Sequence, residues 1–234
     1  MRLCSIDVGV KNLAFVVLDV HSAHSAHSAH SPDSLPAGSG SAVTVRAWVS
    51  ASTVPATTCV RGMCKMEAIE AVFRALDERA DELLECDTVL IEAQPRFSPL
   101  NAQTAHAIAA YFVLRKRVDM DEGVAVHLVH ASRKNAWARV GALPVPALAA
   151  QKPKRAGSKA GLVPALTRSA KYQRNKTDAV DACAEVVARG GCARVARAWA
   201  AFRKKDDAAD AMLQALAWLG HPRSVARVVG SDFF

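Results

Sequence analysis

The chain has 234 residues, and 51% of them are hydrophobic, which is enough for one large α/β domain or two small ones. It carries 30 lysine and arginine residues against 22 aspartate and glutamate residues. The resulting net charge of +8 favours a polyanionic partner such as nucleic acid. No apolar run could span a bilayer, and the first expected strand begins at Leu3, which leaves no room for a presequence. We therefore expect an intracellular protein with no membrane partner.

The six cysteines are scattered along the chain. No two of them form a C-x-x-C pair, and none stands at zinc-ligand spacing with a histidine. We interpret them as buried free thiols in a reducing compartment.

The first part of the chain is rich in β-strand patterns. Strands are expected at Arg2–Ile6, Leu13–Val20, Val43–Val49 and Thr88–Ile91, and helical spacing predicts one helix over Met63–Leu84. Between the first two strands, the residues Val8 to Asn12 form a tight turn.

The second part is mainly helical. Helices are expected at Asn101–Arg117, Ala179–Arg189 and Asp206–Leu219, with a further strand at Val124–Val129. This order of strands and helices predicts an α/β fold with a mixed five-stranded sheet flanked by helices, in a single domain over residues 1–234.

Two segments interrupt this pattern. Residues 21–42 begin with three His-Ser-Ala repeats and continue into a Ser/Pro/Gly-rich stretch, which predicts a flexible insertion at a hairpin tip. The repeated histidines could bind a metal, but a low-complexity loop has nothing to fix their geometry. Residues 144–176 are basic and contain Pro and Gly, which predicts a loop or mobile arm.

Two acids follow apolar strands. Asp7 ends the first strand, and Glu92 comes directly after the strand Thr88–Ile91. Alone, each could be an ordinary turn residue. Pro95 prevents further ladder pairing through its own nitrogen, so the strand ends near Glu92. Acids at the ends of two strands can lie side by side.

Two more acids lie on the last expected helix. Asp207 and Asp210 are three residues apart and share one helix face, although they could also be a solvated first turn. The alanines around them allow the helix to approach the sheet closely, which would bring both carboxylates to the strand ends. Asp206 is an alternative to Asp207, because Asp206 and Asp210 also share a face.

Four carboxylates in one place need cations, and oxygen ligands of this kind suit Mg²⁺ or Mn²⁺. Two ions about 4 Å apart could activate a water and stabilise the leaving oxygen in phosphodiester hydrolysis. A nearby lysine would add positive charge for the transition state, and Lys171 and Lys176 are candidates. Both could instead be plain phosphate contacts on a loop.

Three blocks of sequence resemble one family. They are Ile6-Asp7-Val8-Gly9-Val10-Lys11-Asn12-Leu13-Ala14, Ile91-Glu92-Ala93-Gln94-Pro95-Arg96 and the stretch from Lys204-Lys205-Asp206-Asp207-Ala208-Ala209-Asp210 to Ala215. Together with residues 171–180, they are similar to the Holliday junction resolvases of poxviruses and fungal mitochondria, which are relatives of RuvC. The blocks cover nearly the whole chain in order.

The resemblance implies an RNase H-like fold, a homodimer and no small-molecule cofactor. It implies an endonuclease that makes paired, magnesium-dependent nicks across a four-way DNA junction and leaves ligatable ends. By position, Asp7, Glu92, Asp207 and Asp210 match the acids of the family, and its catalytic lysine falls within residues 171–176. The absent presequence favours the poxviral branch, which implies resolution of replicating viral genomes in the host cytoplasm.

Other functions remain open. A non-catalytic junction-binding protein would keep the basic arm but need not keep four acids. An RNase H or transposase-type nuclease would share the acidic centre but prefer other substrates. A phosphotransferase of the actin-like class would need a second glycine-rich phosphate loop, and the sequence has none.

Overall fold

The computed structural model of the chain describes residues 1–21, 42–54, 64–95, 97–139, 168–190, 192–220 and 228–230. The predicted insertion at 21–42 and the first part of the predicted basic arm lie almost entirely outside these residues. None of the described helices is long and apolar enough to cross a membrane.

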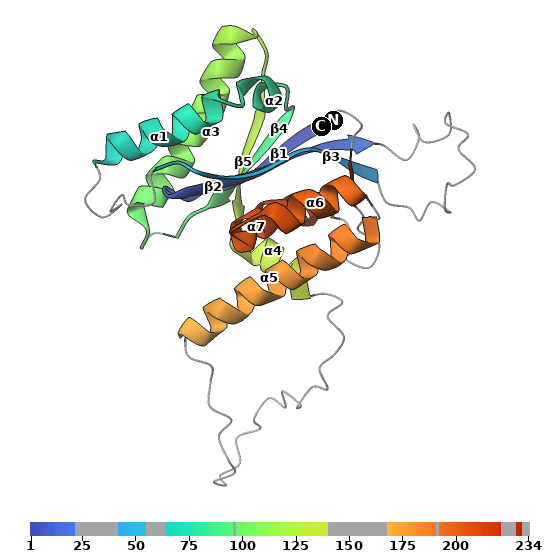
Figure 1. The fold of residues 1–234 in the computed structure, drawn as a ribbon. Coiled ribbons are helices and arrows are strands. Elements are labelled where there is room, and N and C mark those ends of the chain that lie inside the picture. The colour runs from blue at the N-terminus through green and yellow to red at the C-terminus, as the bar shows by residue number, and fades with distance from the viewer. Residues whose placement is uncertain are drawn as a thin grey trace, which may run out of the picture.

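A mixed sheet of six strands forms the centre of the described chain, in the order β5-β4-β1-β2-β3-β6 (Figure 1). The strands are β1 (Arg2–Asp7), β2 (Asn12–His21), β3 (Ala42–Ser52), β4 (Thr88–Ala93), β5 (Ala125–His130) and β6 (Val228–Gly230). Strand β2 runs antiparallel to β1 and β3, whereas β4 is parallel to β1 and β5 is parallel to β4. The five longer strands confirm the predicted sheet, and β6 adds a short edge strand parallel to β3.

Helices cover both faces of this sheet (Figure 1). One face carries α1 (Lys65–Asp77), α2 (Ala80–Leu84) and α3 (Pro99–Asp119), and the other carries α4 (Ala131–Arg139), α5 (Arg168–Gly190), α6 (Ala193–Ala201) and α7 (Lys205–Trp218). Because side chains alternate along a strand, Cys4 and Ile6 pack toward the first group and Leu3 toward the second. The sheet therefore separates two hydrophobic cores.

Helix α7 lies directly against β1 and β2. Its alanines Ala208, Ala209 and Ala211 are completely buried, as expected where a helix approaches a sheet closely. Two hydrogen bonds tie the helix to strands: the Trp48 indole donates to the carbonyl of Ala208 over 3.1 Å, and the Gln214 amide donates to the carbonyl of Ile6 over 3.4 Å. These contacts fix where along the sheet the acids of α7 lie.

The structure corrects four expectations. The single helix predicted over Met63–Leu84 is two helices, α1 and α2, separated by a turn at residues 78–79. The loop predicted up to Lys176 is wrong at its end, because α5 begins at Arg168. No Pro or Gly lies between residues 168 and 189, so nothing prevents the helix there. Helices α4 and α6 were not predicted.

The fourth correction concerns the cysteines. Cys4, Cys86 and Cys183 are buried free thiols as expected, but Cys64 is exposed and Cys192 is half-buried. Cys64 precedes α1 at its N-cap, where the chain is on the surface.

Candidate metal centre

Asp7 and Glu92 come from neighbouring parallel strands. Ile6 of β1 is in register with Ile91 of β4, so the residue that follows each of them lies beside the other at the same edge of the sheet. A tight turn leaves β1 after Asp7. A Cβ atom on Gly9 would lie 2.4 Å from the carbonyl oxygen of Asn12, so the turn accepts only glycine at this position.

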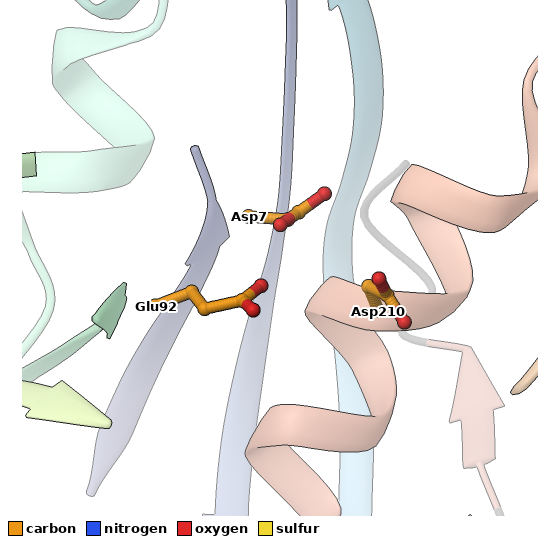
Figure 2. Close-up of side chains that lie close together, drawn as sticks. All are labelled: Asp7, Glu92 and Asp210. Carbon is orange, nitrogen blue, oxygen red and sulfur yellow. The ribbon is translucent and has the colours of Figure 1, made fainter. Parts of the chain in front are cut away.

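Helix α7 supplies the third acid. Carboxylate oxygens of Asp7, Glu92 and Asp210 all lie within 4.8 Å of one another, an arrangement that could hold a metal ion. Figure 2 shows these side chains where the ends of β1 and β4 meet α7. The structure thus brings together three of the four acids expected from the sequence, from two strand ends and one helix face.

Lys134 is a member of this cluster that the sequence analysis missed. Its ammonium lies 2.7 Å from Glu92 and 2.8 Å from Asp210, and only 6% of its side chain is exposed. It belongs to α4, which begins directly after the edge strand β5. Because β5 is parallel to β4, the carboxyl end of β5 lies on the same side of the sheet as the strand ends that carry Asp7 and Glu92. The strand topology alone would therefore have made the residues just after β5 candidates for the acidic centre.

Burial and mutual repulsion set the protonation of these acids. Burial raises the pKa of Asp7 well above its usual range, the nearby Glu92 and Asp210 raise it further, and Lys134 opposes the rise. Burial also raises the pKa of Asp210. Burial acts the same way on Glu92, but the Lys134 ammonium and hydrogen bonding with Asp7 together outweigh it, so the pKa of Glu92 is lowered. One ammonium thus compensates three carboxylates only in part.

Asp207 and Asp206 have different nearest partners. Asp207 lines the same pocket as the three acids, and Lys204 donates to one of its carboxylate oxygens over 2.7 Å. Asp206 accepts instead from Lys176 and is not among the residues that line the pocket. This geometry favours Asp207 over Asp206 as a fourth acid of the centre.

Lys176, one of the two lysines expected from the sequence, makes no ion pair with the three clustered acids in the described structure. Lys176 pairs with Asp206, and its ammonium lies 5.0 Å from the centre of the Tyr172 ring. Lys176 nonetheless lines the pocket. Lys171 is part of α5, and its side chain is outside the described structure.

The acids lie in an open pocket of about 610 Å³. Besides the acids, it is lined by four lysines, Lys11, Lys134, Lys176 and Lys204, by asparagines and by the exposed aromatic side chains of Phe97 and Tyr172. Clustered carboxylates and lysines in one pocket suit a metal-bound phosphodiester.

No protein-family model matches the sequence, and no curated protein is similar to it. Solved structures are similar in fold. The fowlpox virus resolvase, in complex with Holliday junction DNA, matches 94% of this chain and 97% of its own at 15% sequence identity, with a TM-score of 0.53. The chain has the fold of the fowlpox virus resolvase.

This likeness confirms the RNase H-like fold that the sequence resemblance implied. The yeast mitochondrial Holliday junction resolvase matches 96% of this chain and 84% of its own at 16% identity, with a TM-score of 0.48. Thermus thermophilus RuvC in complex with a Holliday junction matches 58% of this chain and 70% of its own at 14% identity, with a TM-score of 0.38. These two scores are too low to add to the fold assignment.

Proposed function

We propose that this chain is a metal-dependent endonuclease that resolves four-way DNA junctions, in the manner of the poxviral and fungal mitochondrial resolvases. The observation that carries the proposal is the convergence of Asp7, Glu92 and Asp210 within 4.8 Å. The fold adds support, because the fowlpox virus resolvase matched over 94% of this chain was solved with junction DNA.

The residues of the centre fit divalent cations. Three clustered carboxylates face one buried ammonium, and Asp207 adds a further carboxylate to the pocket. Hard oxygen ligands and excess negative charge suit Mg²⁺, with Mn²⁺ as a substitute. We assign Asp7, Glu92, Asp207 and Asp210 as ligands of two ions, which when bound would activate a water and stabilise the leaving oxygen.

The lysines have separate roles in this proposal. Lys134 holds the carboxylates of Glu92 and Asp210 in place and supplies positive charge beside the reacting phosphate. Lys11, Lys176 and Lys204 also line the pocket, and they would contact flanking phosphates of the DNA. Lys134 therefore replaces Lys171 and Lys176 as our first candidate for a catalytic lysine.

A homodimer is the proposed assembly, because two nicks across a junction require two active sites. Helix α3 offers a surface for it. Val113, Leu114 and Val118 of α3 are 49%, 61% and 76% exposed, and Leu114 and Val118 are one turn apart on the same face. A second copy of the chain would cover this apolar stripe.

The decisive experiment offers the protein, with Mg²⁺, a synthetic four-way junction, a linear duplex and an RNA–DNA hybrid. We expect symmetric paired nicks in the junction, with ends that ligase can seal, and little cleavage of the other two. The variant Asp210→Asn should bind the junction without cutting it. Preferred cleavage of the hybrid would indicate an RNase H-type enzyme. Junction binding without cleavage in either Mg²⁺ or Mn²⁺ would indicate a non-catalytic binding protein.

A further inference from the structure

The chain contains four asparagines, and all four line the pocket of the acidic centre. They are Asn12, Asn101, Asn135 and Asn175. The pocket includes less than a tenth of the chain's residues, so a random distribution would not place them all there. The sequence analysis gave these residues no role.

The four amides reach the pocket from different elements. Asn12 begins β2, Asn101 lies in the first turn of α3, Asn135 follows Lys134 on α4, and Asn175 precedes Lys176 on α5. Asparagine is a weak helix former, and the interior of a helix offers it no compensating role. Its occurrence within α4 and α5, in a chain rich in alanine, suggests a role in the pocket.

Three of the amides have no partner within the described chain. Asn175 accepts a hydrogen bond of 2.5 Å from Arg139. The side chains of Asn12, Asn101 and Asn135 are half-buried and make no hydrogen bond to another described residue. Their donors and acceptors are therefore available to a molecule in the pocket.

One further amide lines the pocket, Gln94, but it donates to the backbone carbonyl of Glu92 over 3.5 Å. The charged groups of the pocket suit other tasks. Carboxylates bind metal ions, and lysine ammoniums contact phosphates, which carry no sequence information. A neutral amide has both donors and an acceptor, and it can form paired hydrogen bonds with the edge of a base. The amides are thus the groups of this pocket best suited to distinguish one base from another.

We propose that Asn12, Asn101 and Asn135 contact base edges next to the cleaved phosphodiester and so give the enzyme a sequence preference at the cut. This inference rests on the proposed junction-cutting function. The nucleotides within reach would be those next to the metal centre, because the amides line the same pocket as the acids.

The test uses four-way junctions in which each nucleotide flanking the cut is varied through all four bases. For wild type, we expect single-turnover rates that differ by about fivefold to a hundredfold between the best and worst base, the range of one paired base contact. Each of Asn12→Ala, Asn101→Ala and Asn135→Ala should flatten the preference at one position. Gln103→Ala is the matched control, because Gln103 is an exposed amide of α3 that does not line the pocket.

The base preference is a ratio of cleavage rates measured with one protein preparation. Partial unfolding of a variant lowers all of these rates equally, so it does not change the ratio. Equal cutting of all sequences by wild type would overturn the proposal. A variant that slows every sequence by the same factor would do so as well, because it would indicate a contact to phosphate or sugar. Binding of the same junctions in Ca²⁺ gives a second readout. If wild type binds but never cuts, the proposed function fails, and the binding preference still decides the role of the amides.

Discussion

The ammonium nitrogen of Lys134 lies 2.7 Å from a carboxylate oxygen of Glu92, although 42 positions separate the two residues in the chain. This ion pair joins α4 to β4 at the sheet edge where Asp7 also ends its strand. Among the described residues, Lys134 is therefore the lysine that pairs with two of the three clustered acids.

We expect Lys134→Met to lower the single-turnover rate of junction cleavage by roughly a hundredfold or more, the effect of losing one charged stabiliser. The substitution removes the charge but keeps most of the side-chain volume. Lys116→Met is its control, because Lys116 of α3 is also buried and pairs with Glu122, and neither residue lines the pocket. That variant should lose stability but keep its rate per folded molecule. A Lys134→Met rate within about threefold of wild type would remove Lys134 from the mechanism.

The neighbouring acids Asp207 and Asp206 provide a second test. Asp207→Asn should raise the Mg²⁺ concentration needed for half-maximal cleavage and slow the reaction strongly, because Asp207 lines the pocket. Asp206→Asn should change both values by less than about tenfold, because the partner of Asp206 is Lys176. The reverse order of effects would make Asp206 the metal ligand.

The acidic centre should lower the stability of the metal-free protein. The pKa of Asp7 is raised in the folded state, chiefly by burial. The stability that Asp7 contributes is therefore complete below its unfolded pKa of about 3.9 and is lost as the pH rises through the higher folded value. At neutral pH in EDTA, Asp7→Asn should raise Tm by a few degrees, at roughly 2–4 °C per kcal/mol.

Magnesium should reverse the order of the Tm values of wild type and Asp7→Asn. It should raise the Tm of wild type, because it binds the folded acids, and raise that of Asp7→Asn much less. Thermal unfolding in EDTA and in Mg²⁺ measures both effects, with the exposed Asp81→Asn of α2 as the control. Equal Mg²⁺ shifts in wild type and Asp7→Asn would argue against Asp7 as a ligand.

The turn after β1 allows a test by glycine substitution. Gly9→Ala should destabilise the protein by about 1–3 kcal/mol, because its Cβ atom would meet the Asn12 carbonyl oxygen at 2.4 Å. It should also reduce cleavage, since the turn fixes the end of the strand that carries Asp7. Gly123→Ala has no atom within 4 Å of the added Cβ and should be close to neutral. Chemical denaturation of the two variants gives the comparison.

The proposed dimer predicts a change of mass in solution. Leu114→Glu places a charge in the apolar stripe of α3, so we expect a monomer by light scattering and a loss of paired nicking. Met66→Glu, at a 69% exposed apolar residue of α1, should leave the mass unchanged. A wild-type protein that is already monomeric in the presence of junction DNA would contradict the proposed assembly.

Local patterns in the sequence determined most of the fold and three members of the acid cluster. Strand ends are visible in the sequence, because apolar runs stop at Asp7 and Glu92 and turn residues follow them. Helix spacing similarly placed Asp207 and Asp210 on one face of a helix. These features depend on residues within a few positions of one another, so the sequence alone could predict them.

The tertiary structure decided which residues from distant parts of the sequence join the acid cluster. Lys134 stands in a polar helix with no apolar pattern, and nothing local distinguishes it from the other lysines and arginines of the chain. It becomes part of the centre because β5 pairs in parallel with β4 and directs α4 over the same sheet edge. Packing likewise decides that Asp207 lines the pocket and Asp206 does not, since hydrogen bonds of Trp48 and Gln214 fix α7 against the sheet. Strand pairing and helix docking join residues far apart in the chain, and such contacts leave no periodic trace in the sequence.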